Sequence, residues 1–172
     1  VQIDTLTYAK TFFLVVLELY SGFLFVSRVV RSTANATASA FELGYMAFCG
    51  APSMIQCDNG SEFKGDFAEL CKARDIELRH GLPYNHTAQS RVERVNEELR
   101  TALGKMTIDG DGAPLVMQMA RAVYEHNTAP TASGLSPYIL LHARQPRHVL
   151  DRECSVDASP QQLLKTIDAS KA

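Results

Sequence analysis

The sequence has no long apolar run, no excess of positive charge and no closely paired cysteines. Its longest apolar stretch, 12–17, is broken by Glu18 and is too short to cross a bilayer, so we expect no membrane span. The net charge of −2 argues against a domain that holds nucleic acid by bulk charge. The four cysteines lack CxxC spacing, which favours free, mostly buried thiols in a reducing compartment over a zinc site or disulfides.

An initiator methionine, a signal peptide and an internal repeat are also absent. The chain begins inside an apparent strand, so we expect a domain excised from a longer protein. With 172 residues, 46% of them hydrophobic and 21% charged, it is large enough to bury a core of its own. We expect one domain over residues 1–147 and a polar extension over 148–172, with one helix near 160–167.

The order of apolar patterns indicates an α/β fold. We expect strands at about 1–6, 11–19, 23–30, 54–57 and 76–80, and helices at about 33–49, 61–71, 92–106, 114–124 and 138–142. Three opening strands followed by alternating helices and strands predict a mixed five-stranded sheet flanked by helices. In such sheets, functional sites gather at strand ends.

Three acids occupy positions that suit a metal site. Asp4 ends the apolar part of the first strand, Asp58 ends the fourth, and Glu93 lies beside the apolar stripe of the following helix. Mg²⁺ takes oxygen ligands, and two such ions can activate an attacking hydroxyl and stabilise a leaving oxygen on phosphorus. Taken singly, each acid is explained better as a turn residue or a solvated surface residue than as a metal ligand. Their joint order favours the metal site.

Five stretches, in order, carry a family resemblance: QID at 2–4, ELYSGFLFV at 18–26, DNGSEF at 58–63, LPYNHTAQSRVERVNEELR at 82–100 and HNTAPTASGLSPYILLHARQPR at 126–147. In these the chain resembles the catalytic core of retroviral and Ty3/gypsy-type retrotransposon integrases. The resemblance implies an RNase H-like fold and a triad of Asp4, Asp58 and Glu93 that binds Mg²⁺ or Mn²⁺. It also implies an enzyme that trims the 3′ ends of element DNA and transfers them into target DNA.

Matched position implies DNA contacts at four residues: Tyr84 and Gln89 for element ends, and Asn59 and Ser61 for target DNA. Arg94 and Arg100 are two further expected DNA contacts, as the nearby positive charges. Ordinary roles stay open for the first four. Tyr84 can pack on its own loop and Gln89 can face solvent. Asn59 can simply form the turn, and Ser61 can cap the following helix.

Two departures from the family pattern leave rival functions open. The loop before Glu93 lacks the usual Pro and Gly, and Glu97 stands where retroviral relatives often carry Lys. One rival is a domesticated core, catalytically weak or inactive, that acts as a DNA-binding or protein-interaction module. The other is a nuclease of the same fold. The intact triad argues against the first, and the integrase-like stretch at 126–147 argues against the second.

The family resemblance also implies an assembly and a location. Helices after Pro114 carry more apolar surface than one sheet face needs, at Met117, Met119, Val123 and Tyr124, so we expect a homodimer or higher oligomer through this region. The family's zinc-binding and C-terminal DNA-binding modules are not in this sequence. For an active element, we expect the protein in the nucleus during integration and in a virion or virus-like particle before it.

Overall fold

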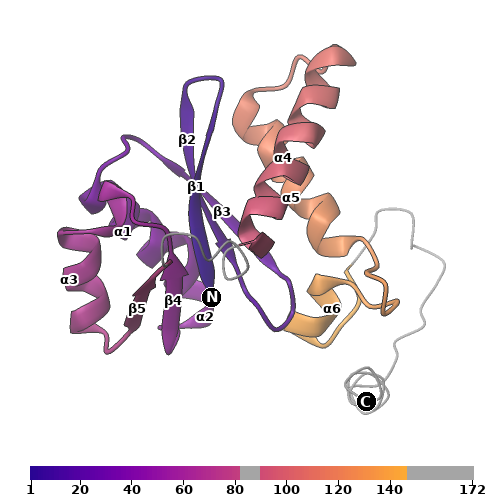
Figure 1. Cartoon of the computed structure of the whole chain (residues 1–172). Coiled ribbons are helices and arrows are strands. Elements are labelled where there is room, and N and C mark those ends of the chain that lie inside the picture. The colour runs from indigo at the N-terminus through magenta and orange to yellow at the C-terminus, as the bar shows by residue number, and fades with distance from the viewer. Residues whose placement is uncertain (82–89, 147–172) are drawn as a thin grey trace.

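A five-stranded mixed sheet of order β3-β2-β1-β4-β5 forms the centre of the protein, which is described by a computed structural model over residues 1–81 and 90–146 (Figure 1). The strands are β1 Gln2–Tyr8, β2 Thr11–Leu17, β3 Leu24–Val29, β4 Met54–Cys57 and β5 Glu77–His80. The first three pair antiparallel, whereas β1, β4 and β5 run parallel. This confirms the mixed five-stranded sheet predicted from the sequence.

Helices cover both faces of the sheet. They are α1 Ala34–Phe41, the π-helical turn η1 Glu42–Met46, α2 Ala47–Cys49, the 3₁₀ turn η2 Ser61–Phe63, α3 Asp66–Ala73, α4 Ser90–Ile108, α5 Leu115–Thr128 and α6 Pro137–His142. Apolar side chains of α1 and α3 pack on one face, and those of α4 and α5 pack on the other. Figure 1 shows these two helical layers on either side of the strands.

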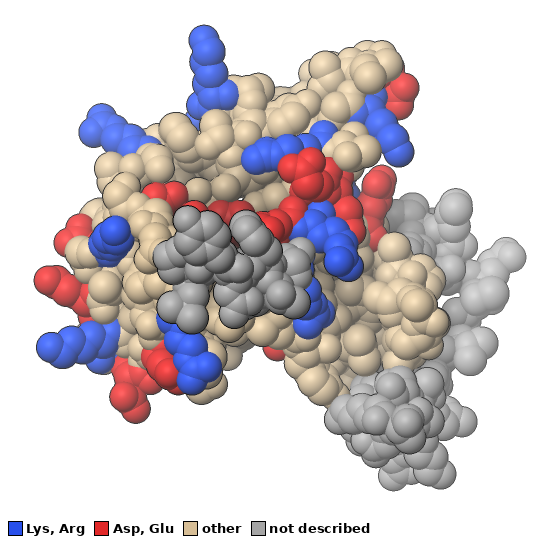
Figure 2. Space-filling model, in the orientation of Figure 1, with Lys and Arg blue, Asp and Glu red and all other residues tan. Residues whose placement is uncertain are grey.

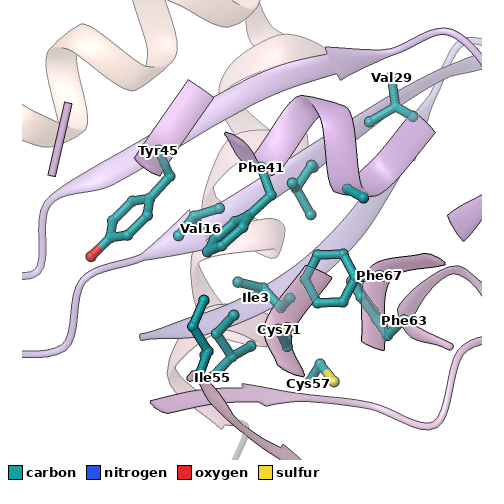
Figure 3. Close-up of a cluster of buried hydrophobic side chains, with 13 residues drawn as sticks. Ile3, Val16, Val29, Phe41, Tyr45, Ile55, Cys57, Phe63, Phe67 and Cys71 are labelled. Atoms are coloured by element: carbon teal, nitrogen blue, oxygen red, sulfur yellow. The ribbon is translucent and has the colours of Figure 1, made fainter. Parts of the chain in front are cut away.

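The side chains of β1 alternate between the two cores, as a strand with helices on both faces requires. Ile3 is fully buried against the α1 and α3 side, where Figure 3 shows it close to Phe41 and Phe67. Leu6 is fully buried in the α4 and α5 core. Asp4 shares the face of Leu6, so the alternation turns its carboxylate toward α4.

Several expected boundaries were wrong. Strand β1 continues to Tyr8, so Asp4 lies inside the strand rather than at its end. The helix expected from Ser61 starts at Asp66, because Gly65 adopts a positive φ of 51° and separates it from η2. Ser61 therefore does not cap α3.

One of the residues predicted for the dimer surface of α5 is buried instead. Gln118, Met119 and Ala122 are buried, whereas Val116 and Tyr124 are exposed. Met119 consequently belongs to the core of the domain and cannot contribute to a dimer surface.

Other expectations concern cysteines, membranes and the C-terminal extension. Cys57 and Cys71 are buried and Cys49 is exposed, and all three are free thiols. Within 1–81 and 90–146, no helix is both long and apolar enough to cross a membrane. The expected helix at 160–167 and the boundary at 147 lie outside the described residues.

Candidate active site

Strands β1 and β4 bring the first two acids of the predicted triad side by side. The strands are parallel and Gln2 is level with Gln56, so Asp58 follows β4 at the level of Asp4. The chain leaves the sheet at this point, and Asp58 Oδ1 accepts a 2.8 Å hydrogen bond from the Gly60 backbone N–H. This local turn holds the exposed Asp58 carboxylate at the edge of the sheet.

Helix α4 brings the third acid to the same place. Glu93 lies in its first turn, and Asn96 follows one turn later on the same side of the helix. The Asn96 side-chain amide donates a 2.7 Å hydrogen bond to Asp4 Oδ2. This bond joins α4 to β1, and Glu93 lies close enough for its charge to act on Asp4.

The electrostatics of Asp4 show that the three acids lie within reach of one another's charge. The pKa of Asp4 is raised to about 6, first by burial and then by the negative charges of Asp58 and Glu93. The backbone N–H of Thr5, at 2.7 Å, and the Asn96 amide act in the opposite direction. Among residues 1–81 and 90–146, no basic side chain contributes to this shift, so the charged groups that act on Asp4 there are both negative.

Figure 2 shows Asp and Glu side chains gathered in the middle of one face, near α4, with Lys and Arg side chains around them. The ion pairs found within the described residues lie elsewhere and involve none of the three acids. A concentration of carboxylates without cationic partners is costly for the protein alone, and a bound cation would relieve it.

The residues present fit a hard divalent cation in chemistry. Carboxylate and amide oxygens are the ligands that Mg²⁺ prefers. Asn96 is 5% exposed, and its Oδ1 atom is buried without a hydrogen-bond partner in the structure. Within the described part of the chain, no three His, Cys, Asp or Glu side chains are drawn together as a finished metal cage. The three acids therefore repel one another, and their oxygen atoms are the type of ligand that Mg²⁺ prefers.

Gly60 keeps space open beside Asp58. A Cβ atom at this position would lie 2.9 Å from Asp58 Oδ1 and 2.7 Å from Glu62 Oε2, which is closer than real side chains approach. Glu62 also accepts a 2.8 Å hydrogen bond from the Thr5 hydroxyl. A larger residue here would force at least one of these carboxylates to move, although the φ of −54° itself is open to any residue.

Sequence reasoning missed Asn96 and Glu62. Asn96 could have been found from its position three residues after Glu93, which places both on one side of the helix. Glu62 had no comparable signal, because its contact with Thr5 joins residues 57 positions apart.

The two predicted target-DNA residues lie next to Asp58 but have different surroundings. The Asn59 side chain donates a 3.2 Å hydrogen bond to the Gly81 carbonyl, so it ties the turn to the end of β5. This supports the alternative that Asn59 forms the turn. Ser61 is exposed at the start of η2.

The two predicted basic contacts lie on other parts of α4. Arg100 pairs with Glu97 at 3.6 Å. Arg94 is exposed and lines a groove of about 650 Å³ between α4 and α5, together with Glu98 and His126. None of the three acids lines this groove. Tyr84 and Gln89 lie outside the described residues, and their roles stay predictions.

Comparison with known proteins identifies the family of this domain. The model of the integrase core domain family matches residues 1–86, a span that includes Asp4 and Asp58 and ends before Glu93. The Gag-Pol polyprotein of avian reticuloendotheliosis virus is 27% identical over 164 residues, which is 94% of this chain and 14% of that protein. The chain thus spans only a small part of the curated relatives it matches.

Solved structures extend the similarity through α4. The HTLV-2 integrase catalytic core domain, in complex with magnesium, is 26% identical with a TM-score of 0.69, covering 82% of this chain and 94% of that one. A chain of a simian T-cell lymphotropic virus intasome is 27% identical with a TM-score of 0.72, covering 85% of this chain and 54% of that one. These neighbours share the RNase H-like fold. The chain belongs to the integrase core domain family, and it is a catalytic core of the retroviral type.

Proposed function

We propose that this domain carries out DNA integration by polynucleotidyl transfer, with 3′-end processing followed by strand transfer of element DNA into target DNA. Asp4, Asp58 and Glu93 are the proposed catalytic residues, and they hold Mg²⁺ or Mn²⁺. One observation carries the proposal: a half-buried Asp4, hydrogen-bonded to Asn96 of α4, whose pKa is raised by burial and by the charges of both other acids. The magnesium complex of the HTLV-2 core supports the choice of cation.

The three acids share the role of holding the cations, but each is held in place differently. When bound, the divalent ions polarise the scissile phosphate and lower the pKa of the attacking water or 3′-hydroxyl. Asp4 is oriented by two donors, the Thr5 N–H and the Asn96 amide. Asp58 is oriented by the Gly60 N–H. Glu93 is exposed, so it can adjust its side chain when substrate and cation arrive.

The residues proposed to contact target DNA lie on a face of the domain that is locally acidic. A phosphate backbone approaching three carboxylates is repelled unless cations neutralise them, so metal and DNA binding are coupled. Ser61 borders the acids at the edge of the sheet and is exposed to a ligand. Asn59 reaches the same edge but already bonds to Gly81.

Strand transfer with the full-length protein tests the proposal through Glu93→Gln. This substitution keeps the size of the side chain and removes its charge, so activity should fall on the order of a hundredfold or more. Glu69→Gln, at an exposed position in the first turn of α3, is the matched control and should retain wild-type activity. Equal activity in the Glu93→Gln protein and the wild type would reject the proposal.

The second candidate is a domesticated core that binds DNA or protein without catalysis. The Glu97–Arg100 ion pair favours it, because it occupies one of the two basic groups expected near the DNA. Calorimetric titration with Mg²⁺ separates the candidates, since a scaffold without catalysis has no need for a cation at Asp4. Binding that is lost in Asp4→Asn supports the enzyme.

Assembly and location follow from the same proposal. HTLV-2 integrase cores are known in dimeric and trimeric forms, and a related chain forms part of an intasome. We propose a homodimer here through α5, where Val116, Met117 and Tyr124 are exposed apolar side chains. Integration into target DNA places the working protein in the nucleus, with an earlier stage in a virion or virus-like particle.

A further inference from the structure

Gln2 is a buried amide at the start of β1. Its side chain is 4% exposed and lies on the face of the sheet that α4 covers. Buried amides need hydrogen-bond partners, because an unsatisfied one costs about 1–3 kcal/mol. Two partners lie within the described residues: Oε1 accepts from the Val92 backbone N–H at 3.3 Å, and Nε2 donates to Gln56 Oε1 at 3.2 Å.

The bond to Val92 reaches the first turn of α4. The N–H groups of a first turn have no carbonyl partner within their own helix, so another group must satisfy them. Here the partner comes from a strand 90 residues earlier in the chain. Glu93 directly follows Val92, and the bond therefore holds the backbone that carries the third acid.

The bond to Gln56 reaches the other acid-bearing strand. Gln56 precedes Asp58 by two residues, just as Gln2 precedes Asp4 by two residues, and the two glutamines are level in the parallel pair. One buried side chain thus contacts all three segments that carry the proposed triad. An apolar residue of similar size would fill the same space, but it would make no hydrogen bonds and would not orient these segments relative to one another.

We infer that Gln2 is a positioning residue that sets Glu93 relative to Asp4 and Asp58 through its hydrogen bond to Val92. The inference rests on the proposed function. A purely structural role would mean only that Gln2 satisfies buried polar groups. The two roles differ in one respect: positioning predicts that Gln2 acts on cation affinity through Glu93.

Calorimetric titration of the full-length protein with Mn²⁺, without DNA, tests this inference in Gln2→Met. The substitution removes the bonds to Val92 and Gln56 and keeps the volume, and Mn²⁺ affinity should fall about tenfold, as it does when residues that orient metal ligands are replaced. Gln56→Met is the matched control. It removes only the bond between the strands, so Mn²⁺ affinity should fall less than in Gln2→Met.

A double-mutant cycle then asks whether the effect passes through Glu93. In a Glu93→Gln background, Gln2→Met should cause no further loss of Mn²⁺ affinity. Gln2→Glu is the rescue variant, and it serves if Gln2→Met does not fold. Its carboxylate can accept the Val92 N–H, and the Gln56 amide can turn to donate to it, so affinity should stay at or above the wild-type value.

Four results would overturn the inference alone: no loss in a folded Gln2→Met protein, equal losses in Gln2→Met and Gln56→Met, additive losses with Glu93→Gln, or a tenfold loss in Gln2→Glu. Unchanged Mn²⁺ affinity in Glu93→Gln itself has a different meaning, because that result would reject the proposed function together with the inference.

Discussion

At the scale of single residues, Asp4 makes the metal-free domain less stable as the pH rises. Its pKa is about 6 in the folded protein against an ordinary value of 3.8, so the folded state binds the proton more tightly than the unfolded chain does. The free energy of unfolding therefore falls as pH rises from about 4 through 6. The penalty at neutral pH is about 3 kcal/mol at most.

Asp4→Asn should remove this penalty. The new side chain can still accept from the Thr5 N–H, and Asn96 can turn its unpaired Oδ1 toward the new amide. We expect the stability gained over wild type, measured by urea denaturation in EDTA, to be larger at pH 7.5 than at pH 4.5. An equal difference at both pH values would show that the charge of Asp4 carries no cost.

Divalent cations should offset most of that difference in stability. A ligand that binds only the folded state stabilises it by about 2.7 kcal/mol at a concentration one hundred times its Kd. Mg²⁺ or Mn²⁺ should therefore raise the melting temperature of the wild type at pH 7.5 and leave Asp4→Asn almost unchanged. Calorimetric scans with and without the cation measure both. Equal cation-induced shifts in the two proteins would contradict the account.

The three acids could be predicted from the sequence, whereas their partners could not. Asp58 is marked by the turn that follows it, and Glu93 by its place on an amphipathic helix. The contacts of Asn96 with Asp4 and of Glu62 with Thr5 cross from one element to another. Such contacts depend on tertiary packing, which no local pattern encodes.

At the scale of elements, two glycines should respond to alanine with opposite signs. A Cβ atom on Gly44 in η1 would collide with the Ser27 side chain on β3, so Gly44→Ala should destabilise the domain by about 1–3 kcal/mol. A Cβ on Gly104 in α4 would meet nothing within 4 Å, and Gly104→Ala should stabilise by about 0.5–1 kcal/mol. Denaturant unfolding measures both, and a shared sign would count against the packing described for η1 on β3.

The sheet and most helices could be predicted because their sequence patterns are local. The errors occur where a residue adopts a backbone conformation or an environment that is unusual for its type. Strand β1 runs two residues beyond the expected end because the turn to β2 uses Ala9 and Lys10, both with positive φ, where Gly or Asn is usual. The buried side of α5 could not be predicted because it includes Gln118, whose side chain donates hydrogen bonds to the carbonyls of Asp111 and Ala113. A buried glutamine is invisible to a rule based on apolar spacing.

At the scale of the whole molecule, α5 should carry the dimer interface. Tyr124 is 49% exposed and Met117 is 53% exposed on this helix, which packs beside the edge strand β3. Tyr124→Asp places a charge there and should shift a dimer to monomer in sedimentation velocity. Ile108→Asp is the control, since Ile108 is more exposed but lies at the far end of α4. A dimer that survives Tyr124→Asp would exclude this surface.

The central claim is that acids from β1, β4 and α4 converge on one cation site. A crystal of the domain soaked in Mn²⁺ and measured for anomalous scattering tests it most directly. The account predicts a strong peak contacted by the carboxylates of Asp4 and Asp58, with Glu93 beside it. An empty map at this position under saturating Mn²⁺, with the three side chains turned to different surfaces, would contradict it.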